Sequence, residues 1–124
     1  MKLLIKIKPA KKAFFLKKIQ RNKKRALDLE IISIRNNTAI ILANPLNKKE
    51  ANNIVNRIRY YSKKLNYKYQ STLLLPFYSS KNVRVYRASR KSKDLFLVVS
   101  ETVRAVCENQ KRAGKLVNTL LFSP

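Results

Sequence analysis

Lysine, arginine and tyrosine are the side chains of this sequence whose types and spacing could do chemistry. Of the 124 residues, 29 are Lys or Arg and six are Asp or Glu, which gives a formal net charge of +23. A compact body with this much positive charge repels itself unless a polyanion supplies counter-charge. Solubility alone needs a net charge of only about 2–8 in a small domain. The composition therefore predicts a polyanionic or strongly acidic partner, and nucleic acid is the commonest one because each neutralised phosphate releases a condensed counterion.

Three basic segments carry most of this charge. The first lies around a helix predicted over Ala10–Lys24, and it contains no acid that could form the i,i+4 pairs of an ordinary solvated helix. The second, Arg57–Tyr69, interleaves cations with tyrosines, which can stack on splayed RNA bases while the cations hold phosphate. The third, Lys81–Lys93, continues from a strand into a loop. The predicted RNA-binding residues are Lys11, Lys12, Lys17, Lys18, Arg21, Lys24, Arg57, Tyr60, Lys63, Lys64, Arg84, Tyr86, Arg87, Arg90 and Lys91.

The tyrosines of these segments have two interpretations. Tyr60 is the better exposed candidate for base stacking, whereas Tyr61 is assigned to the core face of its helix. The alternative is that the rings are buried and only their hydroxyls reach water. Strand alternation places Arg84 and Tyr86 on one face. No zinc finger spacing, RNP aromatic signature or GXXG loop is present, so backbone and shape recognition is predicted rather than base reading.

Catalytic chemistry has few candidate residues. The sequence contains no histidine, the usual general base near neutral pH and the commonest metal ligand. Its six acids form no metal-ligand or paired-carboxylate motif, and its single glycine, Gly114, excludes a glycine-rich phosphate loop. Cys107 lies among apolar residues of a predicted helix, which favours a small buried hydrophobe. The sequence therefore predicts a protein that is not an enzyme and that needs no metal or cofactor.

Hydrophobic periodicity predicts an α+β fold. Hydrophobic residues make up 45% of the chain, enough for a packed core. Residues 1–78 are expected to form a ferredoxin-like split β-α-β-β-α-β sheet. Asn47 and Glu50 predict the start of its second helix, in which Ile54, Val55 and Ile58 face the sheet. The expected elements are strand 3–7, helix 10–24, strand 27–34, a turn at 35–37, strand 39–43, helix 48–65 and strand 71–75, which Pro76 ends.

Residues 79–124 are expected to add a smaller β-β-α-β unit, either as an extension of the sheet or as a second module. Its predicted strands are 83–86 and 95–99. Ser100 and Glu101 suit the start of a helix, and Gly114 suits its left-handed C-cap. A final strand is predicted over Leu116–Phe122.

One resemblance arises from LFLVV, SETVRAVCENQKRA and GKLVNTLLF, over Leu95–Phe122. These residues resemble the C-terminal domain of phycobilisome rod and core linker polypeptides, which has an apolar strand, a short helix, a Gly-Gly-Lys turn and an apolar strand. Ala113-Gly114-Lys115 stands at the turn, so the first glycine is missing. The resemblance covers less than a quarter of the chain. It implies a pigment-free basic protein in an assembly of acidic phycobiliproteins.

The leading hypothesis is a basic RNA-binding structural protein, specifically an rRNA-binding ribosomal protein. Many Lys, Asn and Ile residues with little Gly suggest an AT-rich genome, so an organelle (mitochondrion or plastid) or the cytoplasm of an AT-rich organism is the expected compartment. The alternatives are a linker of an acidic protein assembly, such as the phycobilisome, and a nucleoid-type DNA-binding protein. Lysines within MKLLIKIKPAKK argue against a signal peptide, and no apolar run is long enough to span a bilayer.

Overall fold

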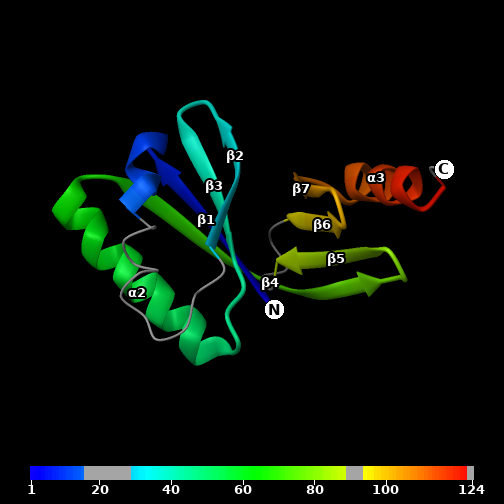
Figure 1. The fold of residues 1–124 in the computed structure, drawn as a ribbon, viewed down its shortest axis with the longest axis horizontal. Helices are drawn as coiled ribbons and strands as arrows, with labels where there is room; N and C mark the ends of the chain where they lie inside the picture. Colours follow the sequence, from blue (N-terminus) through cyan, green and yellow to red (C-terminus); the bar gives the residue numbers. More distant parts are fainter. Residues whose placement is uncertain (16–28, 89–93, 123–124) are drawn as a thin grey trace. The chain divides into compact units, whose positions relative to one another are not determined.

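The computed structural model describes residues 1–15, 29–88 and 94–122, in which seven strands lie in the order β2-β3-β1-β4-β5-β6-β7. Two compact units, Met1–Thr72 (unit 1) and Leu73–Pro124 (unit 2), divide the chain within β4. Figure 1 labels most of the elements. Their bounds are β1 Lys2–Lys8, the 3-10 helix η1 Ala10–Phe15, β2 Leu29–Arg35, β3 Thr38–Ala43, α2 Lys48–Leu65, β4 Lys68–Ser79, β5 Val83–Ala88, β6 Phe96–Ser100, β7 Arg104–Cys107 and α3 Gln110–Phe122.

The core of unit 1 lies between one face of its sheet and helix α2 (Figure 1). β3 pairs antiparallel with both β1 and β2, and the register sets Ile5 opposite Ile41. Because directly paired residues share a face, Ile5 and Ile41 both reach the core, where they meet Ile54 and Ile58 of α2. The expected burial of Ile54 and Ile58 is confirmed, and Val55 is partly buried.

Local side-chain chemistry sets the ends of these elements. Asn36 and Asn37 have φ values of 52° and 58°, so they supply the left-handed backbone that the β2–β3 turn requires. The Glu50 N–H donates to Asn47 Oδ1 at 2.9 Å, which confirms Asn47 as the N-cap of α2. Asn66 ends the helix in a left-handed conformation, and its N–H donates to the Ser62 carbonyl. Asparagine therefore does in this glycine-poor chain what glycine does elsewhere.

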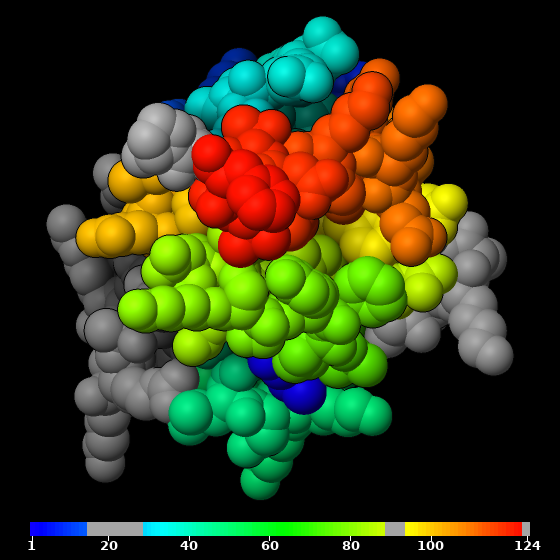
Figure 2. All heavy atoms as spheres, turned by 90° about the vertical axis from the view of Figure 1, so that its right-hand side faces the viewer, coloured from blue at the N-terminus to red at the C-terminus, as the bar shows by residue number. Residues whose placement is uncertain are grey.

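Unit 2 packs α3 against its sheet. β6 pairs antiparallel with β5 on one side and with the short β7 on the other. A buried cluster joins Ala113 of α3 to four sheet residues, which are Val83, Val85, Phe96 and Val98. The other α3 residues at this cluster recur at helical spacing, and they are Leu116, Val117 and Leu120. Figure 2 shows α3 (orange to red) beside the β4–β5 hairpin (green to lime) on one face of the unit.

A β-bulge interrupts the β4–β5 pair. Leu75 lies opposite Arg87 and Tyr78 lies opposite Val85, with the register shift between Pro76 and Tyr78. A bulge sets two residues of one strand against one of the other and re-aims a side chain. Phe77 is the additional residue. Leu75 and Tyr78 therefore lie on the same face of the sheet as Arg87 and Val85.

The predicted fold class was wrong. A ferredoxin-like split β-α-β-β-α-β sheet followed by a smaller β-β-α-β unit was expected, whereas the described residues form a mostly antiparallel seven-stranded sheet with two α-helices. The described start of the expected first helix is the 3-10 helix η1, in which the Lys12 N–H donates to the Pro9 carbonyl. β4 also continues through Pro76 instead of ending there, because the bulge accommodates that residue.

The predicted order of elements in unit 2 was wrong as well. The expected helix after Ser100 is instead a tight turn followed by β7, because Ser100 Oγ accepts from the Val103 N–H at 3.0 Å and closes the turn. The N-cap is Asn109, whose Oδ1 accepts from the Arg112 N–H at 2.8 Å. The expected final strand lies inside α3, and Gly114 is a residue of that helix rather than its C-cap.

Candidate nucleic-acid interface

The outward face of α2 combines an exposed aromatic ring with cations. Tyr60 is 62% exposed, and Lys64 Nζ lies 5.9 Å from the centroid of its ring. Arg57 and Lys63 are also exposed, and both lie within one turn of Tyr60. After Glu50 in the first turn, the helix contains no acidic residue. These four predicted site residues (Arg57, Tyr60, Lys63 and Lys64) are therefore brought together by one helix, and we call them the α2 face.

Two neighbouring contacts shape this face. Tyr61 holds the Tyr60 ring edge-on, with centroids 5.2 Å apart and planes at 81°. Arg59 Nε donates to Tyr69 Oη at 3.1 Å, which ties the helix to β4. A shallow depression lies among Asn56, Arg59, Tyr60, Lys63 and Lys64. The depression is open and basic, so it could accept a phosphate beside a base stacked on Tyr60.

A second basic depression lies at the ends of β1 and α2. Lys8 and Lys68 line it together with Asn37, Asn66 and Tyr67. Lys8 and Lys68 are exposed. Lys68 belongs to the second basic segment predicted from the sequence, whereas Lys8 lies outside all three segments, because strand ends and turns that are distant in sequence meet here. The nearby predicted residues Lys11 and Lys12 lie on η1, where Lys11 is exposed and Lys12 is partly buried.

Tyr67 and Tyr60 both belong to the second basic segment, Arg57–Tyr69, but they have opposite environments. Tyr67 is buried, and its hydroxyl donates to the Ile58 carbonyl at 2.6 Å. Burial raises the pKa of Tyr67 far above its usual value, and the neighbouring Tyr69 raises it further. The alternative interpretation of the tyrosines, a buried ring with a bonded hydroxyl, therefore applies to Tyr67.

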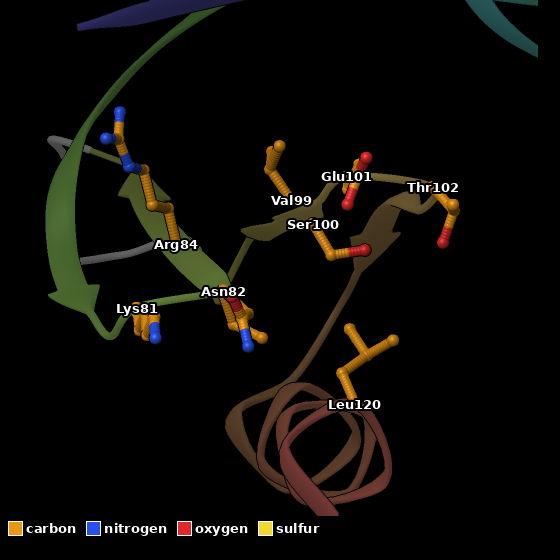
Figure 3. A pocket seen from close by; sticks show the side chains of 9 residues that line it. Lys81, Asn82, Arg84, Val99, Ser100, Glu101, Thr102 and Leu120 are labelled. Carbon is orange, nitrogen blue, oxygen red and sulfur yellow. The ribbon is translucent and has the colours of Figure 1, made fainter. Parts of the chain in front are cut away.

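The predicted residues of unit 2 are divided between environments. Arg84 is exposed on β5, and its side chain points away from Leu120 (Figure 3). Tyr86 is only 7% exposed, so its ring is not open to a base. Arg87 is partly buried, and its guanidinium carbon lies 5.6 Å from the ring centroids of both Phe77 and Phe96. Of these three, only Arg84 and Arg87 can reach a phosphate.

Phe77 and Tyr78 were not predicted as site residues from the sequence. Phe77 is 48% exposed, and Tyr78 beside it is 44% exposed. The Phe77 ring meets the Phe96 ring edge-on, with the two centroids 5.6 Å apart. Both follow Pro76, which had been expected to end the strand. Two aromatic residues directly after that proline, in a segment without acids, were the signal that could have identified them.

A larger hollow in unit 2 lies between the β4–β5 turn, the β6–β7 turn and α3 (Figure 3). Its volume is about 680 Å³, and it is lined by Lys81, Asn82, Ser100, Glu101 and Leu120, among others. Glu101 supplies negative charge to this hollow. The mixed charge fits a polyanion less well than the α2 face does.

Other predicted residues lie outside the residues that the structure describes. They are Lys17, Lys18, Arg21, Lys24, Arg90 and Lys91. The RNA contacts predicted for the first basic helix and for the last loop therefore stay predictions.

Cys107 is buried in β7, and burial raises the pKa of its thiol. A thiol with a raised pKa is a weaker source of thiolate, which is the nucleophilic form. Across residues 1–15, 29–88 and 94–122, no group of three or more His, Cys, Asp or Glu side chains could hold a metal ion. In the same part of the chain, neither α-helix has the length and apolar character needed to cross a bilayer.

Comparison with known proteins gave no match. No protein-family model fits the chain, and no curated protein or solved structure matches it significantly.

Proposed function

We propose that the protein is an RNA-binding structural protein whose α2 face contacts phosphate and stacks one base on Tyr60. The observation that carries this proposal is the exposed Tyr60 ring set among Arg57, Lys63 and Lys64 on a helix face without acids. Cations would supply phosphate contacts independent of sequence, and a tyrosine ring stacks on any base.

Several further features support a large polyanion. No Asp or Glu stands between Glu50 and Asp94, a segment that includes the α2 face, Lys68, Arg84 and Arg87. The net charge of +23 exceeds what solubility requires. Ribosomal RNA is the partner that we propose, because so large an excess of charge fits a dense array of phosphates. The absence of catalytic chemistry stays a prediction that follows from the histidine-free sequence.

The test measures the affinity of wild-type protein for a structured RNA over a range of salt concentrations. Phosphate contacts predict a log–log slope of about −0.7 to −0.9 per contact. Replacing Arg57, Lys63 and Lys64 by Ala should weaken binding to many RNA sequences alike and flatten the slope by about two to three units. Tyr60→Ala should weaken binding by about 1–3 kcal/mol with little change in slope.

A matched control is available on the same helix. Lys48 and Lys49 lie in the first turn of α2 and are exposed, outside the α2 face. Replacing both by Ala removes two positive charges, against three in the α2-face variant, and should change affinity and slope much less per charge removed. The proposal fails if the two sets of variants weaken binding equally, or if wild-type protein binds no RNA at low ionic strength.

A further inference from the structure

The β4–β5 pair of unit 2 presents an aromatic strip that the α2 face does not explain. Phe77 and Tyr78 are about half exposed, and Leu75 beside them is also exposed. The bulge places Leu75 and Tyr78 on the face that holds Val85 and Phe96, and the Phe77 ring contacts Phe96 from the same side. Helix α3 covers this face over β5, β6 and β7. The strip therefore continues the core of unit 2 out to solvent at β4.

Arg87 gives this strip its charge. Its guanidinium carbon lies at the same distance, 5.6 Å, from the Phe77 and Phe96 centroids, of which Phe96 is fully buried. An arginine stacked on rings retains N–H donors at the rim of its planar group, and these can bind phosphate in a bidentate manner. The half-exposed Phe77 ring beside it offers a π-face to a planar ligand.

We propose that Phe77, Tyr78 and Arg87 form a second RNA site that stacks an unpaired base on the Phe77 ring, while Arg87 holds the phosphate next to that base. This inference rests on the proposed function and extends it to single-stranded segments, because a base inside a duplex does not expose its face. It predicts that the two units bind different features of one RNA.

Charge favours RNA over a protein as the occupant of this strip. A purely apolar partner gains nothing from the Arg87 charge, and the β4–β5 turn also carries the exposed cation Lys81. A nucleotide uses both features, since its base is planar and apolar on its faces and its phosphate is anionic. A protein occupant is the competing outcome of the test below.

The chain contains no tryptophan, so Phe77→Trp introduces a single fluorescent reporter at the proposed site. The larger ring retains the π-face, and a stacked base should quench its emission. We expect quenching by a single-stranded oligouridylate of about ten nucleotides, and little quenching by a blunt RNA duplex. Phe122→Trp is the matched control, because Phe122 is 82% exposed on α3 of the same unit. Its emission should change little with either RNA.

The second variant, Phe77→Leu, keeps apolar volume against Phe96 and removes the π-face. It should weaken binding of the oligouridylate about 5- to 150-fold, which corresponds to ~1–3 kcal/mol of stacking at ~1.4 kcal/mol per factor of ten. Affinity for the duplex should remain within about twofold, because phosphate contacts elsewhere are retained. If Phe77→Leu fails to fold, quenching in the Phe77→Trp variant decides the matter alone.

The outcomes separate this inference from the proposed function. One outcome overturns only the second site: wild-type protein binds the duplex with salt dependence, but quenching is not specific and Phe77→Leu has no effect. Equal loss of duplex and single-strand binding in Phe77→Leu, or equal quenching at both Trp positions, overturns it too. Failure of wild-type protein to bind either RNA at low salt overturns both proposals.

Discussion

At the scale of single residues, tyrosines of similar sequence context have different roles. Tyr60 and Tyr67 both stand among lysines and arginines, yet Tyr60 lies exposed on α2 and Tyr67 is buried. The difference comes from the C-cap: Asn66 turns the chain through a left-handed residue, so Tyr67 points back at the helix and its hydroxyl reaches the Ile58 carbonyl. One tyrosine is therefore free to stack, and the other stabilises the junction of α2 with β4.

Tyr67→Phe tests this structural role. The variant loses the hydrogen bond to Ile58 and keeps the buried ring, so we expect it to lower the free energy of unfolding by about 0.5–1.5 kcal/mol near pH 8. Urea unfolding followed by circular dichroism would measure the change. RNA affinity should be unaffected. Tyr60→Ala, in contrast, should weaken RNA binding and leave the free energy of unfolding unchanged.

The stability of wild-type protein relative to Tyr67→Phe should also depend on pH. The pKa of Tyr67 is raised in the folded state from its ordinary value of 10.0. The folded state therefore holds the phenolic proton more tightly than the unfolded state, and this contribution is fully present below about pH 10 and is lost as pH rises above that value. The stability advantage of wild type over Tyr67→Phe should therefore shrink as the pH rises above about 10. An advantage that grows over this range would contradict the role given to Tyr67.

At the scale of elements, α3 shows how one capping residue moves a boundary. Ser100 and Asn109 are both good N-cap residues. Ser100 is used to close the β6–β7 turn, and Asn109 starts the helix instead. The apolar residues that had suggested a final strand, such as Leu116 and Leu120, then fall on the buried side of α3. An apolar segment of this length fits either a buried strand or a helix, and its tertiary contacts decide.

Replacing Gly114 or Asn109 by Ala should change the stability of the protein in opposite directions. Gly114 lies within α3, has no positive φ, and has nothing within 4 Å of the place where a Cβ would stand. Gly114→Ala should therefore stabilise the protein by about 0.5–1 kcal/mol through helix propensity. Asn109→Ala should destabilise it by about 0.5–2 kcal/mol through loss of the cap. Thermal or urea unfolding measures both. Destabilisation by Gly114→Ala would instead indicate the left-handed C-cap that the sequence had suggested.

At the scale of the whole molecule, charge is the dominant property. A net charge of +23 creates a long-range field that attracts any polyanion and decays with salt. Salt dependence by itself therefore does not separate RNA from an assembly of acidic proteins, the alternative that the resemblance of Leu95–Phe122 to phycobilisome linkers had raised. In the structure that segment forms β6, β7 and α3.

Competition separates these two partners. If the native partner is RNA, excess structured RNA should displace the protein from it at low ionic strength, because both bind the same cations. A protein enclosed in an assembly of acidic subunits should not be released by RNA. The measurement is the fraction of protein released from its native complex as RNA is added, with an uncharged polymer as control. Failure of RNA to release any protein would contradict the RNA-binding proposal.

The sequence by itself determined the charge, the scarcity of catalytic groups, and the elements whose signals are local. β1, the β2–β3 hairpin and α2 were predicted because two-residue alternation, the Asn36-Asn37 turn and the Asn47 cap act within a few residues of the chain. The buried side chains of α2 followed from apolar residues that recur at three- and four-residue steps.

Only the tertiary structure decided the sheet order, the boundaries of β7 and α3, and which aromatic residues face solvent. Pairing across the sheet carries β4 past Pro76, and its bulge brings Tyr78 onto the face of Arg87. Burial of Tyr86 and exposure of Phe77 depend on which neighbours pack against each strand. Such contacts join residues distant in sequence, and no local pattern encodes them.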